Sequence, residues 1–252
     1  TGSKEHNIAM RQRAIDQGLR LNEFGLIPEA LAGDLKGMEA AVHSLEASTE
    51  ADIYAHLGLA YVPPELREDT GEVAAAMGND LPALLEPSMI RGSLHNHTNL
   101  SDGEASLEVM ADAAHRMGWS WLGLADHSPT LVIANGASAD DLLAQGATVR
   151  AANAEWAEQG KDFRLFHGVE SDVLEGGKLD HPDEVLNELD YVVASVHALG
   201  RWRGRDEQTN TEELLQAIDH PATTVLGHPT GRILQGRDGY EVDLMAVLDH
   251  MA

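Results

Sequence analysis

The spacing of apolar residues divides the chain into two parts. Up to about residue 60, apolar positions recur at roughly helical spacing, and we expect helices at residues 4–18, 34–46 and 48–58. From residue 89 onward, short apolar runs of strand length alternate with stretches of helical periodicity. This alternation predicts an α/β fold built on a parallel sheet or barrel.

The two parts are separated by a segment that breaks regular structure. Pro63 and Pro64 lie in "YVPPELREDTGE", and adjacent prolines interrupt both helices and strands. We expect residues 61–88 to form a linker with one short helix, between a small, mostly helical domain at 1–60 and an α/β domain at 89–252. Ser48 or Thr49 is expected to cap the helix at 48–58, because an acidic residue follows a few positions on.

The second part contains five predicted strands. We expect the strands within residues 90–98, 120–128, 163–173, 191–199 and 223–231, and the helices at 106–117, 139–158, 211–218 and from residue 242. Each strand is followed by side chains suited to metal binding: His95, His97, His127, Glu170, His197 and His228. The carboxyl ends of parallel barrel strands meet at one mouth, so we expect these six side chains to line one pocket.

The residue types at these positions indicate a centre for divalent ions. His95 and His97 are two residues apart, which places both on one face of a regular strand. Imidazoles suit Zn, Mn or Fe, and a glutamate among them can bridge two ions. Paired metals about 3.5–4 Å apart suit hydrolysis of phosphate esters. Asp102, in the turn "SDG", is either a further ligand or the N-cap of the next helix.

The other histidines carry no such signal. An isolated histidine is more often a core or surface residue than a ligand. We assign that role to His6, His43, His56, His115, His181, His220 and His250.

Composition narrows the functional classes. The chain has 42 acidic and 17 basic residues, a net charge of -25, which argues against broad electrostatic binding of nucleic acid. A high-salt cytoplasm or an ordinary solvated surface would each account for this acidity. Cysteine is absent, so disulfides and thiolate metal sites are excluded. We find no signal peptide and no apolar run near the length of a membrane span, and we expect a cytoplasmic protein without a membrane partner.

Five motifs in order resemble a known family. "LHNHTNLSDG", "LADHS", "GVESDVL", "VVASVHAL" and "LGHPTGR" resemble the PHP (polymerase and histidinol phosphatase) domain. The version is similar to the one at the C-terminus of bacterial and archaeal family X DNA polymerases. Upstream, "TGSKEHNIAMRQRAIDQGLRLNEFGL" looks like a polymerase beta-like thumb and "DIYAHLGLAYVPPELRE" like the connector that follows it. The resemblance covers essentially the whole chain.

The resemblance implies a fold and a set of metal ligands. The fold would be a distorted (βα)7 TIM-like barrel, of which this chain would supply about five βα units. The family binds up to three Mn²⁺ or Zn²⁺ ions. It implies three ligand groups, with Glu170 shared: His95, His97 and Glu170; Glu170, His197 and His228; Asp102 and His127. The residues that it implies for catalysis are Glu170, His197, His228 and Asp102.

The resemblance also implies a function in DNA repair. It suggests a metal-dependent phosphoesterase acting on gapped or single-stranded DNA 3' ends, as a 3'-5' exonuclease or a 3'-phosphodiesterase or phosphatase. Gly2 and Asn7 match thumb positions near an incoming nucleotide, and Arg11 matches one near the template strand. Arg232 could hold a substrate phosphate, because a guanidinium fork suits phosphate; a structural salt bridge is the alternative.

Two other functions stay open at this stage. One is a small-molecule phosphatase of the histidinol phosphatase type, and the other is a non-catalytic metal-binding module. The oligomeric state is also open.

Two departures from the family affect what we expect of this chain. The family's palm domain, with its catalytic carboxylates, would precede Thr1, so we expect no templated polymerase activity. Two further strands and an Asp-x-His pair would follow Ala252. We therefore expect a piece of a longer polymerase with weakened activity. It would hold about one tight ion, at Glu170, His197 and His228.

Overall fold

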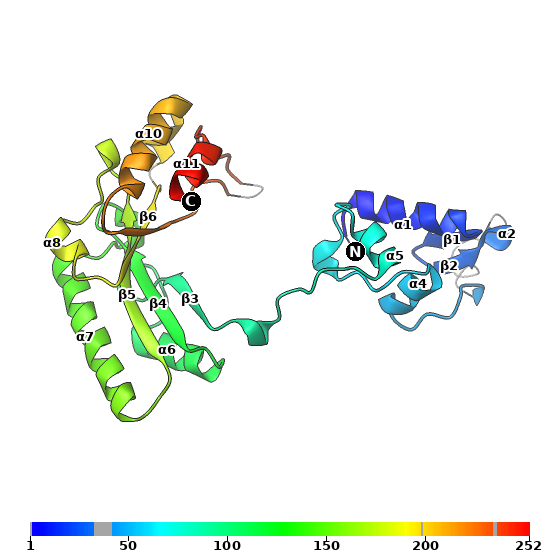
Figure 1. Cartoon of the computed structure of the whole chain (residues 1–252), viewed down its shortest axis with the longest axis horizontal. Helices are drawn as coiled ribbons and strands as arrows, with labels where there is room; N and C mark the ends of the chain where they lie inside the picture. The colour runs from blue at the N-terminus through cyan, green and yellow to red at the C-terminus, as the bar shows by residue number, and fades with distance from the viewer. Residues whose placement is uncertain (1, 33–41, 198, 234–235) are drawn as a thin grey trace. The chain divides into compact units, whose positions relative to one another are not determined.

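The protein folds into two compact units. The computed structural model describes residues 2–32, 42–197, 199–233 and 236–252. The chain divides into Thr1–Leu85 and Glu86–Ala252 (Figure 1). Most of the helix expected at 34–46 lies outside the described residues.

The first unit combines helices with one β-hairpin. Its elements are α1 (Lys4–Asp16), β1 (Leu19–Asn22), β2 (Gly25–Pro28), α2 (Glu29–Ala32), α4 (Glu50–His56), the 3-10 turn η1 (Pro64–Leu66) and α5 (Glu72–Gly78). Thr49 caps α4 in a capping box with Asp52, so the helix start expected at Ser48 or Thr49 falls at Thr49. Ser3 caps α1 by accepting from the backbone N–H of His6.

The hairpin was not expected from the sequence. β1 and β2 pair antiparallel around a two-residue turn, with Asn22 opposite Gly25. The Asn22 side chain accepts from the backbone N–H of Phe24, and Gly25 has φ +126°, a conformation that favours glycine. The strands are only four residues long, and Leu19 and Leu21 continue the apolar spacing of α1. The periodicity alone therefore could not separate them from a helix.

The segment expected as a linker contributes to the core of the first unit. Val62 and Ala76 are buried and pack in one cluster with Met10, Leu26 and Tyr54. The division between the units falls after Leu85. The folded part of the first unit thus extends well beyond residue 60.

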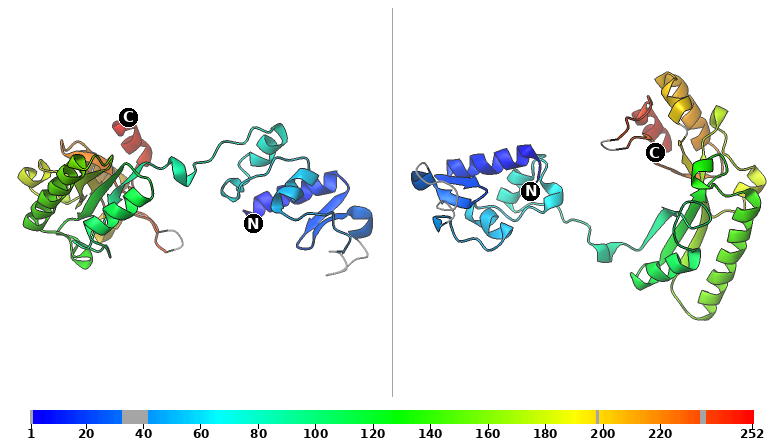
Figure 2. Two further views of the ribbon diagram at one scale, coloured as in Figure 1. Left: turned by 90° about the horizontal axis from the view of Figure 1, so that it is seen from below. Right: turned by 180° about the vertical axis from the view of Figure 1, so that it is seen from behind.

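The second unit is built on five parallel strands. They pair in chain order as β3 (Gly92–Asn96), β4 (Trp121–His127), β5 (Arg164–Asp172), β6 (Tyr191–Ser195) and β7 (Thr223–Leu226). The helices of this unit are α6 (Leu107–Arg116), α7 (Ala139–Glu158), α8 (Asp183–Leu186), α9 (Leu199–Arg203), α10 (Glu207–Ile218) and α11 (Leu244–Met251). The predicted α/β alternation is confirmed, and α7 has the predicted bounds. Figure 2 shows the same unit from two other directions.

Among the predicted helices of this unit, α10 differs most from its expected start. α10 begins four residues before the expected Thr211, because the Asp206 side chain caps it and accepts from the N–H of Thr209. Among the described residues, no helix is long and apolar enough to cross a membrane.

The sheet is curled rather than flat. In a flat sheet, four spacings of about 4.8 Å would separate β3 from β7 by roughly 19 Å. The rings of His95, on β3, and His228, just after β7, lie only 5.8 Å apart. The carboxyl ends of the two edge strands therefore approach each other, as in part of a TIM-like barrel.

Candidate metal centre

The carboxylate of Glu170 lies at the centre of a histidine cluster. Glu170 is 1% exposed, and the pairing of β4 with β5 places it directly beside His127. The carboxylate oxygens lie close to five imidazoles: His95 Nε2 (2.9 Å), His97 Nε2 (3.6 Å), His127 Nδ1 (2.8 Å), His197 Nε2 (3.2 Å) and His228 Nε2 (2.8 Å). The structure thus brings together the six strand-end side chains that the sequence singled out.

His95 and His97, the first two candidate ligands, converge for a reason that the sequence pattern missed. β3 is irregular, since its register with β4 shifts between Ser93 and Asn96. His95 has φ +64°, and His97 lies just beyond the strand. The two rings still meet at 5.2 Å. A regular strand alternation is therefore not what aims them at Glu170.

Two histidines of the cluster have strained backbones. His95 has φ +64° and His228 has φ +23°, and this region is costly for residues other than glycine. Such strain persists when surrounding contacts hold it. For His95, the backbone N–H donates to the Tyr191 hydroxyl at 3.3 Å.

Asp102 reaches the same cluster from the loop after β3. Its carboxylate lies 3.7 Å from His97 Nδ1 and 3.5 Å from His127 Nε2. The alternative role as a helix cap does not apply, because Ser106 caps α6. Asp102 is half-exposed, so it forms the solvent side of the cluster.

Sequence reasoning missed a carboxylate that anchors this loop. Asp126 is fully buried and accepts from Thr98 N (2.7 Å) and Thr98 Oγ1 (2.8 Å). It also accepts from Ser101 Oγ and Gln145 Nε2, both at 2.7 Å. Asp126 therefore ties the loop that carries Asp102 to β4. The signal available in the sequence was its place beside His127 in "LADHS".

A second missed carboxylate orients His197. Asp172 Oδ1 accepts from the backbone N–H of His197 at 3.2 Å and lies 3.1 Å from its Nδ1. This contact leaves Nε2 directed at Glu170, an arrangement that commonly fixes the tautomer of a metal-binding histidine. Asp172 lies two residues after Glu170 on β5, and this spacing was the available signal.

The electrostatics of the cluster favour a charged Glu170. Burial alone would raise its pKa, but His127, His197 and His228 contact the carboxylate and hold its pKa well below the usual range. Burial lowers the pKa of His97. Burial also opposes charge on His197, yet Asp172 and Glu170 raise the pKa of that imidazole to about 9. The site therefore buries a negative charge within a ring of nitrogen donors.

The donor set fits divalent ions. Three buried atoms of the cluster, His97 Nδ1, His127 Nδ1 and Glu170 Oε2, form no hydrogen bond of suitable geometry among the described residues, although the last two lie 2.8 Å apart. Three groups also have ligand atoms within 4.8 Å of one another: His95, His97 and Glu170; His97, Asp102 and His127; His127, Glu170 and His197. Nitrogen and carboxylate oxygen donors without thiolates suit Zn or Mn. An ion held there would supply Lewis-acid chemistry and activate water.

His228 lies at the open side of the site, and Arg232 follows it in the next loop. The side chain of His228 is 48% exposed and contacts Glu170 Oε1, but it does not belong to the three groups above. Arg232 is exposed in the loop that follows His228. Its guanidinium has no ion-pair partner within the described part of the chain, which leaves the alternative role in a structural salt bridge without support.

The remaining histidines assigned to core or surface lie outside these groups. His6 is buried and contacts Glu72 and Tyr54, while His220 and His250 contact surface carboxylates. Over the described residues, the three groups include none of His6, His43, His56, His115, His181, His220 and His250.

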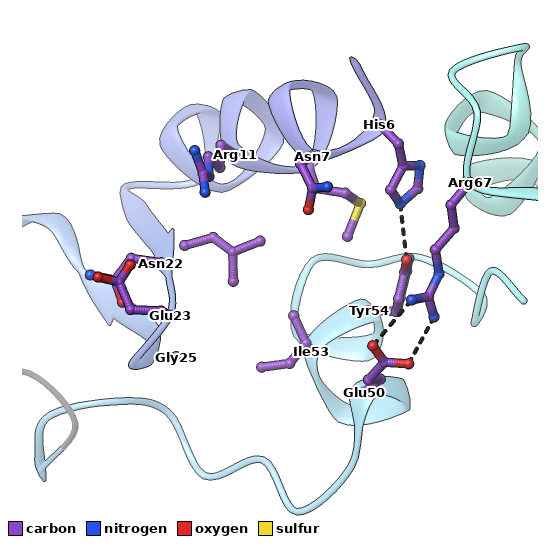
Figure 3. A pocket seen from close by; sticks show the side chains of 12 residues that line it. His6, Asn7, Arg11, Asn22, Glu23, Gly25, Glu50, Ile53, Tyr54 and Arg67 are labelled. Atoms are coloured by element: carbon purple, nitrogen blue, oxygen red, sulfur yellow. Dashed lines mark hydrogen bonds and ion pairs between the residues drawn. The ribbon is translucent and has the colours of Figure 1, made fainter. Parts of the chain in front are cut away.

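The thumb residues lie in the first unit. Asn7 and Arg11 line a pocket of about 520 Å³ between α1, the hairpin and α4 (Figure 3). Gly2 lies beside the backbone of Arg67, has φ +121°, and has no space for a Cβ. Asn7 Nδ2 donates to Ser3 O at 2.8 Å. The structure therefore gathers two of the three predicted residues at one pocket and places Gly2 at the start of α1.

Family comparisons agree with this architecture. The family model of the PHP domain matches residues 93–249. The chain belongs to the PHP domain family. The family model of the DNA polymerase beta thumb matches residues 1–68, so the first unit of this PHP protein, called the thumb unit below, is similar to that thumb.

Known relatives of this PHP protein include a polymerase and phosphatases. It is 37% identical over 249 residues to the DNA polymerase/3'-5' exonuclease PolX of Bacillus subtilis, covering 99% of this chain and 40% of that protein. A probable phosphatase of Thermoanaerobacter sp. is 29% identical over 158 residues, which cover 61% of this chain and 57% of the phosphatase. A solved structure of Leishmania infantum polymerase beta, a ternary gap complex, is 32% identical over 27% of this chain and 28% of its own, with a TM-score of 0.24. The chain thus spans less than two thirds of these relatives.

Proposed function

We propose that the PHP unit is a metal-dependent phosphoesterase that acts on the 3' ends of DNA. The observation that supports the proposal is the surroundings of the buried Glu170 carboxylate. Five imidazoles lie within 3.6 Å of its oxygens. Four of them come from the ends of four strands, and the fifth comes from the turn after β3. Such a cluster is suited to holding metal ions beside one another. Paired ions bind and activate both the attacking and the leaving oxygen of a phosphate ester.

The DNA part of the proposal rests on the first unit. A polymerase beta-like thumb precedes the PHP domain in this chain, and a relative of the same domain order is named as a polymerase and 3'-5' exonuclease. Asn7 and Arg11 line the thumb pocket, and we assign them to contacts with a nucleotide and a template strand. Gly2 would allow close approach at the start of α1. A role in DNA repair and a cytoplasmic location remain predictions.

The catalytic roles are assigned within the cluster. Glu170, His197, His228 and Asp102 surround the position at which a phosphate ester would meet the ions. Arg232, exposed after His228, is assigned to a substrate phosphate because a guanidinium donates in a fork that matches phosphate oxygens.

The test compares two phosphate esters. The chain is loaded with Mn²⁺ or Zn²⁺ and offered a 3'-labelled single-stranded oligonucleotide or histidinol phosphate, with Glu170→Gln as the inactive control. We expect removal of nucleotides or phosphate from the 3' end, most strongly with Mn²⁺. Hydrolysis of histidinol phosphate alone would support a small-molecule phosphatase instead, a function favoured by the similarity to probable phosphatases. Metal binding without cleavage of either compound would indicate a non-catalytic metal-binding module.

The number of ions is a separate part of the proposal. We propose about one tightly held ion, bound by Glu170, His197 and His228, because three protein ligands and water form an adequate catalytic shell. A second ion, at His95, His97 and Glu170, would be held more weakly. His127 is the competing third ligand, since it is more buried and also contacts Glu170. Metal content after dialysis is compared for His228→Ala and His127→Ala. Loss of the ion only in His127→Ala, or three tightly held ions in the wild type, would contradict the assignment.

A further inference from the structure

Two segments beside the metal centre have a charge opposite to that of the whole chain. Residues 199–205, "LGRWRGR", follow closely after His197, and residues 229–237, "PTGRILQGR", follow His228. Together they contain five arginines and no acidic residue, whereas the chain has 42 acidic and 17 basic residues. Positive charge is therefore concentrated in the two segments that leave the site.

Two of the five arginines are used to build the fold. Arg201 Nη1 and Arg205 Nη1 both contact Oε2 of the buried Glu213, the first at 2.5 Å. Their guanidinium groups also lie 4.7 and 6.0 Å from the ring centre of the buried Trp202. These contacts fix residues 199–205 against α10.

The other three arginines keep their charge available to solvent. Arg203, Arg232 and Arg237 are exposed, and we call them the arginine rim. Arg203 Nη2 donates to the backbone carbonyl of Asp238, and Arg237 Nη2 donates to that of Gly231 at 3.0 Å. A carbonyl does not neutralise a guanidinium. In the described part of the chain, no carboxylate forms an ion pair with any of the three.

The described residues of the two segments are connected through Tyr240, which follows the second segment. The rings of Trp202 and Tyr240 lie 5.1 Å apart, and the Tyr240 hydroxyl donates to Pro229 O at 2.6 Å. Asn210, fully buried, donates to Trp202 O at 2.7 Å and to Glu241 O at 2.9 Å. α10 and α11, which flank these segments, lie side by side in the second unit (Figure 1). The rim is therefore held at the carboxyl ends of β6 and β7, the end that carries His197 and His228.

We propose that the arginine rim binds the phosphodiester backbone of the DNA strand whose 3' end lies at the metal centre. This inference rests on the proposed function and deepens it. A polynucleotide presents several phosphates next to the one being cut, whereas a small phosphomonoester presents a single phosphate. Arg232 can contact a phosphate of either substrate, whereas Arg203 and Arg237 gain contacts only with the polymer, and each phosphate contact makes binding depend on salt. The rim thereby selects for DNA in a chain whose overall charge repels it.

The test measures binding separately from hydrolysis. The full chain, kept free of metal with EDTA, is titrated into fluorescein-labelled oligothymidylate at several salt concentrations, and anisotropy gives the affinity. In Arg203→Gln/Arg232→Gln/Arg237→Gln we expect weaker binding and a log–log salt slope that is smaller by about 2, or about 0.7 per lost contact. The matched control is Arg91→Gln/Arg116→Gln/Arg164→Gln, because these arginines lie at the opposite, amino ends of the strands. The control should keep the wild-type slope.

A conservative variant and the metal-loaded protein complete the test. Replacing the three rim arginines by lysine keeps the charges, so the salt slope should stay near that of the wild type. With Mn²⁺, the glutamine variant should show a higher KM for oligothymidylate by at least about tenfold. The proposal that the rim binds DNA is wrong if the glutamine variant keeps the wild-type salt slope, or if the control variant loses as much of the slope as the glutamine variant does. If the chain binds the oligonucleotide through the rim but does not hydrolyse it, the proposed function is wrong and the proposed role of the rim in DNA binding is retained.

Discussion

Both units of the molecule bury histidine against glutamate, but they do so in different ways. In the thumb unit, His6 Nδ1 lies 2.5 Å from Glu72 and His6 Nε2 lies 3.0 Å from the Tyr54 hydroxyl. Every ring nitrogen of that histidine thus has a protein partner. In the PHP unit, five histidines contact the single carboxylate of Glu170. Among the described residues, His97 Nδ1, His127 Nδ1 and Glu170 Oε2 form no hydrogen bond of suitable geometry, although the last two lie 2.8 Å apart.

The contrast separates a structural contact from a metal centre. A buried polar group that is fully partnered stabilises one packing arrangement, and leaving such a group unpartnered costs about 1–3 kcal/mol. Several unpartnered donors aimed at one point therefore indicate a ligand that satisfies them. The number of donors relative to carboxylates, rather than burial, distinguishes His6 and Glu72 from the Glu170 cluster.

The largest effect should follow from Glu170→Gln. The amide keeps the size of the side chain but removes the buried charge that holds the ions. We expect loss of bound metal after dialysis and a fall in phosphate-ester hydrolysis of at least about 100-fold, because metal activation contributes several kcal/mol. Elemental analysis and a hydrolysis assay measure both effects. Full metal content in this variant would show that the Glu170 carboxylate is not needed to hold the ions.

The matched change in the thumb is Glu72→Gln. It takes the carboxylate from His6 and from the backbone N–H groups of Asp69 and Thr70. We expect the free energy of unfolding of the first unit to drop by about 1–3 kcal/mol, with metal content unchanged. All four tryptophans lie in the PHP unit, so urea unfolding followed by far-UV circular dichroism should shift while the tryptophan signal stays in place. A drop in metal content would erase the distinction between the two clusters.

Asp126→Asn probes the support of the metal centre rather than the centre itself. The amide keeps only one acceptor oxygen, so it cannot accept both from Thr98 N and Ser101 Oγ, which share Oδ1, and from Gln145 Nε2, which uses Oδ2. The loop that carries Asp102 should therefore loosen. We expect metal affinity to fall by about tenfold, at the lower end of the range for groups that orient metal ligands. Metal titration measures the change. The conservative Asp126→Glu should restore part of the metal affinity. If Asp126→Asn binds metal as tightly as the wild type, Asp126 contributes to packing alone.

The smallest effect that we expect is a loss of stability of the thumb unit at acidic pH. Burial opposes charge on Glu72, but His6 and the N–H groups of Asp69 and Thr70 outweigh it and lower its pKa below 4.5 in the folded protein. Because the folded pKa is the lower one, the stabilisation is complete above about pH 4.5 and is lost as the pH falls through the folded value. Urea unfolding by circular dichroism should show this loss in the wild type. In Glu72→Gln the same interval of pH should have less effect on the first unit.

The agreement between sequence and structure differs between the units. In the PHP unit, strand and helix periods alternate over long stretches, so the order of the five strands and the bounds of α7 could be predicted. The grouping of the six candidate metal-binding side chains could be predicted too, because each lies at the end of an apolar run. In the thumb, the four-residue strands of the hairpin are too short to show a period of their own. Residues 61–85 also pack into the first unit, but the sequence did not predict this, because the proline pair in that segment indicated a linker.

The sequence by itself determined which residues can bind metal and which strand end carries each of them. It did so because parallel strands place their carboxyl ends at one edge. Only the tertiary structure decided how they meet: through the irregular β3, the positive φ of His95 and His228, and the curl that brings the two edge strands together. It also assigned Asp126 and Asp172 their roles. Those contacts join residues 19 or more positions apart, and no local pattern records a contact over such a separation.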